Sequence, residues 1–305
     1  MKIRKILSAV SAAAMVLTLT ACNDGETTSN PFDVFNSGSS SSSAISSGST
    51  SSLSSLSSEE TSSSIPESPA SDFEYEINQE LGGALITVYL GENSVVNIPS
   101  EIDGNKVVGI DRMAFAKCSQ LSDVIIPDGV TVIGDQAFDE CHSLKSVIIP
   151  NSVTEIGEFA FRNCINLSDL TMSENVTKIG MVAFSCCFKL KSFTIPKKLN
   201  IISRSMLNMC NGLTSITIPS GVTEIEDYAF SECSALKTVT ISDGVTKIGE
   251  RAFYNCDAIR SITLPDSVTS VEYNAFYGCN AKITYKGKTY LPKEYQNLYI
   301  AVNNN

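Results

Sequence analysis

The chain has 305 residues, 43% hydrophobic and 18% charged, so it can bury a substantial core in one or two domains. Its formal net charge is −11, and loss of residues 1–21 would leave 19 Lys and Arg against 33 Asp and Glu, a net charge of −14. No basic stripe is visible. This balance argues against nucleic acid as a partner and against electrostatic attraction to anionic lipid.

Residues 1–21 have the layout of a secretory signal. Three basic residues among the first five precede an apolar stretch over residues 6–19. The sequence LTAC, ending at Cys22, resembles a bacterial lipobox, which implies cleavage before Cys22 and a diacylglycerol on its thiol. The alternatives are an ordinary cleaved signal and an N-terminal membrane helix. We predict an exported protein held on the extracellular face of the cell membrane by the lipid at Cys22 alone.

Residues 22–71 are predicted to be the lipidated N-terminus and a disordered tether. Runs of serine dominate this segment from Thr27 to Ser71. Such a composition has too little apolar surface to offset the entropy cost of ordering the chain. As a flexible coil, the tether would hold its ends about 35–40 Å apart.

The remaining chain repeats every 23 residues. The stretches VTVIGDQAFDECHSLKSVIIPNS and VTEIGEFAFRNCINLSDLTMSEN align without a gap. At each step a large apolar residue recurs, at Phe115, Phe138, Phe161, Phe184, Leu207, Phe230, Phe253 and Phe276. A cysteine recurs three residues later, at Cys118, Cys141, Cys164, Cys187, Cys210, Cys233, Cys256 and Cys279. A fixed period over eight units predicts a solenoid of stacked coils.

Each unit reads C-x-x-L-x-x-V-x-I-P-x-x-V-T-x-I-G-x-x-A-F-x-x. The alternating β-branched residues predict a strand that the proline ends. The V-T-x-I stretch predicts a second short strand, and A-F-x-x-C predicts a short turn or a single helical turn. Coils stacked about 4.8 Å apart would continue a parallel β-sheet through the domain.

This pattern resembles the BspA-type leucine-rich repeats of bacterial and protozoan surface proteins, over roughly residues 73–300. The stretches Val95–Phe115 and Ile283–Asn303 resemble the first unit and the C-terminal cap of that family. The resemblance implies a β-rich, right-handed leucine-rich repeat coil with a parallel β-sheet and short turns, and roles of the adhesion type. A solenoid must cover its two apolar ends, so caps are expected on physical grounds as well.

We therefore divide the chain beyond residue 71 into three parts. An N-terminal β cap with the first unit covers 72–110 and includes a hairpin built from FEYEI and ALITVYL. The repeat solenoid covers 111–282, and the C-terminal cap covers 283–305. In one unit Ser203 replaces the glycine and Met206–Leu207 replaces Ala–Phe. This coil should close with altered local geometry, because its apolar volume is retained.

The stretch AFDECHSL at residues 137–144 suggests a metal site or an activated thiol. However, Cys141 belongs to the cysteine column, and the column of His142 is as varied as a solvent-facing position. The columns of Asp139 and Glu140 are equally mixed. The chain has no plausible catalytic triad, phosphate-binding glycine loop or H-E-x-x-H motif. We predict no metal, no cofactor and no enzymatic activity.

The column cysteines are predicted to be structural. Zinc sites pair cysteines as C-x-x-C, which this single file lacks, and parallel Cβ vectors disfavour disulfides between neighbouring coils. We expect buried thiols that fill space and donate weakly to a turn carbonyl. Cys186 lies outside the column and is predicted to be the most exposed thiol, where a mixed disulfide is an alternative.

Three surfaces are candidates for contact with an extracellular protein or glycan. The exposed strand positions carry mainly Ser, Thr and Asp, with Ile125 and Ile148 in the first coils, and form either a shallow binding surface or a solvated ladder. Apolar residues stand in variable columns beside the irregular unit, at Ile165, Met181, Val182, Phe188 and Met209. Tyr254 and Tyr277 share a column near a Tyr-rich C-terminus, where packing against the cap is the alternative. A structural spacer without a ligand is the alternative function.

Overall fold

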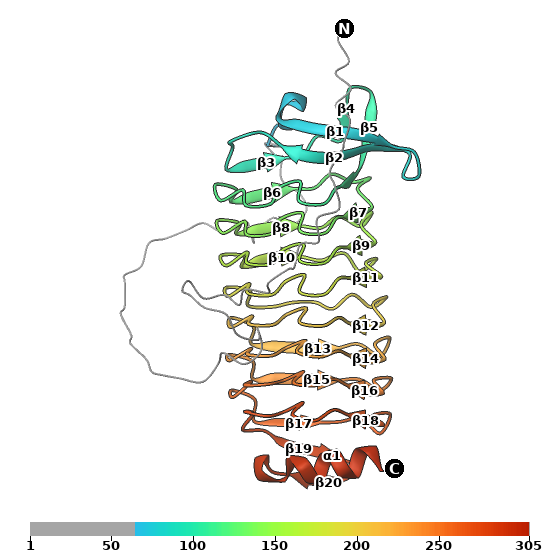
Figure 1. Ribbon diagram of the computed structural model, residues 1–305, viewed down its shortest axis with the longest axis vertical. Coiled ribbons are helices and arrows are strands. Elements are labelled where there is room, and N and C mark those ends of the chain that lie inside the picture. Colours follow the sequence, from blue (N-terminus) through green and yellow to red (C-terminus); the bar gives the residue numbers. More distant parts are fainter. Residues whose placement is uncertain (1–64, 305) are drawn as a thin grey trace, which may run out of the picture. The chain divides into compact units, whose positions relative to one another are not determined.

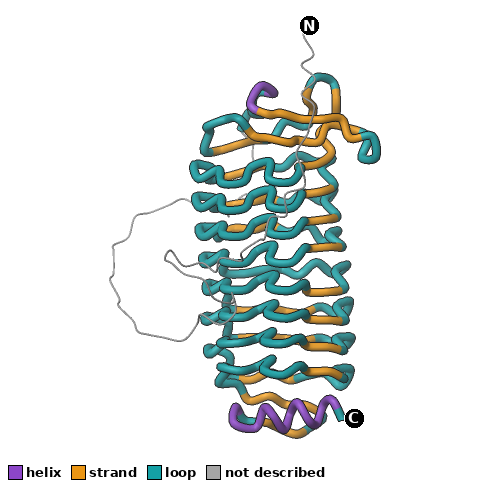
Figure 2. Tube along the Cα trace, in the orientation of Figure 1, coloured by secondary structure: helices purple, strands orange, loops and turns teal. Residues whose placement is uncertain are grey.

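The computed structural model describes residues 65–304, which form a stack of about nine coils (Figure 1). Each regular coil has two strand-bearing sides and one side made of turns, as the tube in Figure 2 shows. The predicted signal segment, Cys22 and residues 22–64 of the predicted tether lie outside the described residues.

The first side of the stack carries the strands that a proline follows in most coils. They are β3 (Val95–Asn97), β6 (Asp123–Ile125), β8 (Ser146–Ile148), β10 (Asp169–Thr171), β13 (Ser215–Ile218), β15 (Thr238–Ile241) and β17 (Ser261–Thr263). After β10 and β15 a serine takes the place of the proline. Neighbouring strands pair in parallel with partners 23 residues apart, as in Val124 with Val147. The predicted parallel sheet is therefore confirmed, although it is not continuous.

The second side carries the V-T-x-I strands. They are β5 (Asn105–Ile110), β7 (Val132–Ile133), β9 (Glu155–Ile156), β11 (Lys178–Ile179), β12 (Ile201–Ile202), β14 (Glu224–Ile225), β16 (Lys247–Ile248) and β18 (Ser270–Val271). On both sides the sheet is interrupted at the irregular unit, between β10 and β13 and between β11 and β12. There the Ser203 hydroxyl donates to the Ile179 carbonyl. In the regular coils the equivalent carbonyl accepts from the N–H of a glycine, as Ile156 does from Gly180.

The turn side contains no helix in any coil, which settles the choice between a turn and a helical turn. Two columns here adopt φ between 53° and 62° in residues other than glycine. Examples are Gln136 and Glu140. Such left-handed residues cost about 1–2 kcal/mol each. Bonds between coils offset this cost, because the N–H groups of Gln136, Phe138 and Glu140 donate at 2.7–2.8 Å to carbonyls of the next coil.

Columns of identical residues fill the interior. The rings of Phe115, Phe138, Phe161 and Phe184 stack with centroids 4.9–5.2 Å apart, and a second stack runs from Phe230 to Phe276. These side chains and the leucine column are almost fully buried. Aromatic pairs in contact contribute about 0.5–1.5 kcal/mol beyond the area that they bury.

Each end of the stack is capped. At the N-terminus η1 (Ala70–Asp72) precedes the predicted hairpin of β1 (Phe73–Asn78) and β2 (Gly83–Tyr89), and Tyr89 stacks on Phe115 with centroids 5.1 Å apart. A further short strand, β4 (Glu101–Ile102), pairs with β5.

At the C-terminus β19 (Lys282–Tyr285) continues the first side in parallel and β20 (Lys288–Tyr290) returns antiparallel. Then η2 (Pro292–Glu294) leads into α1 (Tyr295–Asn303). The Asn303 side chain bonds both the N–H and the carbonyl of Val271, and so closes the edge of β18.

Candidate binding site at the C-terminal end

The stretch AFDECHSL at residues 137–144, which suggested a metal site, is explained by contacts between neighbouring coils. His142 is exposed, and the Cys141 thiol donates to the Phe115 carbonyl at 3.1 Å. Asp139 is buried, which corrects the expectation of a solvent-facing position. Its carboxylate accepts two hydrogen bonds from Arg162 of the next coil, at 2.8 and 2.7 Å. Among residues 65–304, no group of three or more His, Cys, Asp or Glu is arranged to hold a metal ion.

The column cysteines lie in the interior, except that Cys118 is half-buried. In the other seven, the thiol donates at 2.8–3.4 Å to the carbonyl of the residue 26 positions earlier, which is Phe or, for Cys233, Leu207. Burial raises the pKa of the Cys233 thiol to about 12. Burial also raises the thiol pKa at Cys141, Cys164, Cys187, Cys210 and Cys256. A thiol held in its protonated form is a poor nucleophile and a poor metal ligand.

Cys186 is buried rather than exposed, with 4% of its surface accessible. Its left-handed backbone, with φ of 62°, places the sulfur beside Ser185 and 4.0 Å from the Met209 thioether of the next coil. The prediction of the most exposed thiol was therefore wrong. Within the described residues the more accessible position is Cys118, because the N-terminal cap rather than a regular coil precedes it.

The apolar residues beside the irregular unit are not exposed together. Met181 is 39% exposed, but Val182 is buried, and Ile165, Phe188 and Met209 are half-buried. The surface they offer is thus smaller than the sequence suggests, because the turn columns pack coil upon coil. A contact role for these five residues stays a prediction. On the strand side the Thr positions from Thr171 to Thr263 are exposed, as expected of either a binding surface or a solvated ladder.

The tyrosines of the last two coils and α1 gather at the C-terminal end. Tyr254 and Tyr277 stack, with ring centroids 5.8 Å apart and an interplanar angle of 10°. Tyr273 meets Tyr299 of α1 edge to face at 6.2 Å. Tyr273 and Tyr277 remain 59% and 60% exposed. Tyr285 and Tyr290, in contrast, are buried in the cap.

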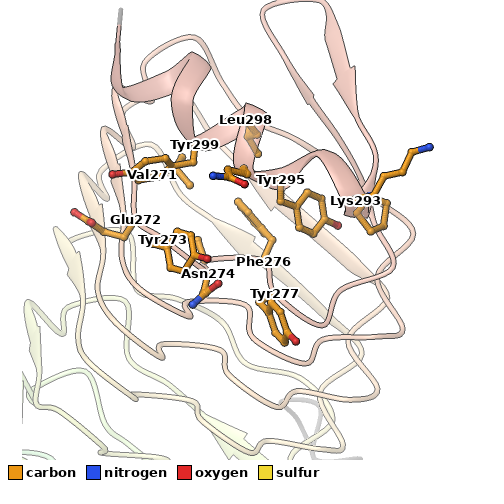
Figure 3. A pocket seen from close by; sticks show the side chains of 13 residues that line it. Val271, Glu272, Tyr273, Asn274, Phe276, Tyr277, Lys293, Tyr295, Leu298 and Tyr299 are labelled. Carbon is orange, nitrogen blue, oxygen red and sulfur yellow. The ribbon is translucent and has the colours of Figure 1, made fainter.

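Tyr273, Tyr277 and Tyr299 border a pocket between the last coil and α1, with a volume of about 210 Å³ (Figure 3). We call it the C-terminal tyrosine pocket, defined by Tyr273, Phe276, Tyr277, Tyr295 and Tyr299. Phe276 forms its floor beneath α1 and meets the Tyr295 ring at 6.1 Å. The Tyr295 hydroxyl donates to the Ala281 carbonyl, and burial raises its pKa.

A row formed by Tyr228, Arg251 and Tyr254 leads along the turn side to Tyr277 at this pocket. The Arg251 guanidinium lies 5.6 Å from the Tyr228 ring centroid and 5.5 Å from that of Tyr254. It also donates to the Tyr228 hydroxyl at 2.9 Å. Sequence reasoning identified Tyr254 and Tyr277 but missed Tyr228 and Arg251. The signal that could have found them is their position in one column, 23 residues apart.

The pocket also contains a backbone N–H donor whose equivalents in earlier coils are hydrogen-bonded to the following coil. Phe230 and Phe253 donate their N–H groups to Ala252 and Ala275 of the following coil, both at 2.8 Å. No coil follows the last one, and the equivalent N–H of Phe276 donates to no other described residue. A buried donor left without an acceptor costs about 1–3 kcal/mol. The floor of the pocket therefore favours a ligand that carries an acceptor.

Comparison with known proteins agrees with this architecture. The family described as BspA type leucine rich repeat region matches residues 108–237 and 223–290, in six copies. The chain belongs to the BspA-type leucine-rich repeat family. Members of this family are typically surface proteins of bacteria, built on a repeat scaffold that is typically non-enzymatic. No curated protein matches the chain.

Three solved structures of leucine-rich repeat proteins are similar. The T. pallidum leucine rich repeat protein is 30% identical, with a TM-score of 0.58, over 64% of this chain and 91% of that one. A protein from Bacteroides ovatus is 27% identical, with a TM-score of 0.54, over 70% and 66%. A leucine rich cell surface protein from Faecalibacterium prausnitzii shares the fold at 22% identity, with a TM-score of 0.53, over 75% and 97%.

Proposed function

We propose that this protein is a non-catalytic binding protein outside the cell, which holds a protein or glycan partner on its solenoid. The observation that carries the proposal is the exposed aromatic surface of Tyr273 and Tyr277 at the mouth of a pocket with an unused backbone donor. Aromatic walls with a few polar groups are typical of ligand sites. Repeat solenoids generally act through such extended surfaces.

The titratable groups support binding rather than catalysis. Among the described residues, the largest upward shifts in pKa belong to buried cysteines and to Tyr295, all caused mainly by burial. A general acid–base mechanism needs a group poised near neutral pH within reach of a substrate. These shifts move the cysteines and Tyr295 further from neutral pH, so they favour inert structural groups.

We place the protein on the outer face of the cell membrane, through a lipid on Cys22. The lipobox-like LTAC sequence and the basic and apolar segments before it support this proposal. No helix in residues 65–304 has the length and apolar character needed to cross a membrane. The test is Cys22→Ser in cells fed labelled palmitate. Loss of label from the protein is expected, whereas retained label would refute the lipid anchor.

A binding screen tests the function itself. The chain without residues 1–21 and with Cys22→Ser would be applied to a glycan array and to immobilised host extracellular proteins. We expect saturable binding that Tyr277→Ala weakens and that Ile148→Ala, on the distant strand side, leaves unchanged. Absence of any saturable binding would favour a structural spacer instead.

A further inference from the structure

The C-terminal end of the turn side differs chemically from every coil before it. In the regular coils up to three alternate N–H groups on this side donate to carbonyls of the next coil, as Phe253 does to Ala275 and Asn255 to Tyr277. N–H groups between them bond within their own coil, as Tyr254 does to Arg251. In the last coil Asn274, Phe276 and Gly278 occupy the same columns, and their N–H groups make no such bond within the described residues. Asn274 and Phe276 line the C-terminal tyrosine pocket. Their donors thus face the place that a further coil would fill.

The acceptor that suits these donors is neutral. Backbone N–H groups held in turns can form a concavity that binds an anionic oxygen, so the charges around the site decide whether an anion or a neutral oxygen fits. The lining residues include one basic and one acidic side chain, Lys293 and Glu272, and both point away from the pocket (Figure 3). The chain as a whole carries a net charge of −11. The described lining residues thus offer an anionic ligand no cationic partner and the net charge disfavours one, whereas a neutral carbonyl oxygen needs neither.

The aromatic side chains that line the pocket indicate the shape of the remainder of the ligand. Tyr273 and Tyr277 present largely exposed rings, and Phe276 lies between them and α1. A flat face of C–H groups packs well on such rings, while the tyrosine hydroxyls can bond hydroxyl groups at its edge. The volume of about 210 Å³ lies below the ~300–1,000 Å³ of pockets for drug-sized ligands. The pocket therefore has room for one ring and a short substituent.

We infer that the C-terminal tyrosine pocket binds an N-acetylated hexosamine unit of a glycan. The sugar ring lies against Tyr277 and Tyr273, and its acetamido carbonyl accepts from the N–H groups of Phe276 and Asn274. The rest of the glycan leaves the pocket along the row of Tyr254 and Arg251. This inference rests on the proposed binding function and names the ligand class for it.

Titration of the isotope-labelled chain, without residues 1–21 and with Cys22→Ser, tests the inference. The probes are N-acetylglucosamine and N-acetylgalactosamine, with glucose, galactose, glucuronic acid and a blocked N-acetyl dipeptide as comparisons. We expect at least one N-acetyl sugar to bind with a dissociation constant of about 1 mM, about tenfold tighter than every comparison compound. The amide resonances of Asn274 and Phe276 should shift on binding.

Matched variants separate the pocket from the rest of the surface. Tyr277→Ala and Tyr273→Ala should each weaken binding about tenfold, whereas Ile148→Ala should not change it. Circular dichroism confirms that each variant is folded. The inference would be overturned if glucose, galactose, glucuronic acid or the dipeptide bound as tightly as the N-acetyl sugars. Resonance shifts confined to amides other than Asn274 and Phe276 would also overturn it. If the N-acetyl sugars fail while the array shows another partner, the inference falls and the binding function stands.

Discussion

Phe193 lies edge-on to Phe184, with ring centroids 5.1 Å apart and an interplanar angle of 67°. Phe193 comes from the strand side of the irregular coil, in the column held by Val147 and Ile216 in other coils. The same coil has Leu207 where other coils have phenylalanine. The aromatic ring that the phenylalanine column lacks at Leu207 is thus supplied by Phe193 from the strand side. This exchange of an aromatic and an aliphatic residue occurs where both sheets are interrupted.

This exchange predicts that residues 193 and 207 are energetically coupled. Leu207→Phe alone should destabilise by about 1–3 kcal/mol, because it overpacks the core. In a Phe193→Leu background the same change should cost at least about 1 kcal/mol less, since the ring returns to its usual column. Urea unfolding of the wild type, both single variants and the double variant measures the coupling. Strictly additive effects would show that the two residues fill separate spaces.

The thiol column should contribute to stability position by position. Cys233→Ala removes a buried sulfur and its hydrogen bond to the Leu207 carbonyl, and should cost about 1–2 kcal/mol. Cys118→Ala is the matched control, because Cys118 is half-buried, and it should cost less than half as much. Equal losses in urea unfolding would mean that neither burial nor the thiol bond matters.

Stability should fall in alkaline solution. Burial raises the folded-state pKa of Cys233 to about 12, above the value of about 8.5 for an unfolded thiol. The stabilisation is complete below the lower of these values and is lost as pH rises toward the higher one, because only the unfolded chain releases the proton. Each such thiol removes about 1.4 kcal/mol per pH unit in this window.

The measurement is the free energy of unfolding as a function of pH, in the wild type and in Cys233→Ala. Above a pH of about 8.5 the free energy of unfolding should fall less steeply with pH in the variant than in the wild type. The difference in slope should correspond to the release of one proton on unfolding. Alkylation of the native protein provides a second readout, in which Cys118 should react faster than Cys233. Superimposable pH curves would contradict a buried, neutral thiol.

The ion pair between Asp139 and Arg162 should be worth more than the surface pairs. The Asp139 side chain is 4% exposed, and its removal would leave the Arg162 guanidinium partly buried without its main partner. Asp139→Ala should therefore cost about 3 kcal/mol. Glu174→Ala breaks the exposed pair with Lys197 and should cost at most about 1 kcal/mol. Similar losses in thermal or urea unfolding would show that Asp139 is effectively solvated.

The fold and most of its interior could be predicted because a period of 23 residues makes side chains at that spacing vertical neighbours. The Phe and Cys columns and the repeated strands of the regular coils follow from this one number. The predictions that failed concern the turn side. Asp139 and Cys186 stand in varied columns, and varied columns on an ordinary turn face solvent. Here the next coil lies close enough that Asp139 accepts from Arg162 and the Cys186 sulfur lies 4.0 Å from Met209.

The candidate site depended still more on tertiary structure. The sequence by itself determined the repeat, and therefore which residues are inside, and it placed Tyr254 and Tyr277 in one column. Only the folded chain decided that the stack ends at Phe276 with an unused N–H group and that α1 folds back to make a pocket above it. The physical reason is that a periodic sequence specifies contacts between equivalent coils, whereas an end has no equivalent neighbour and is shaped by whatever packs there.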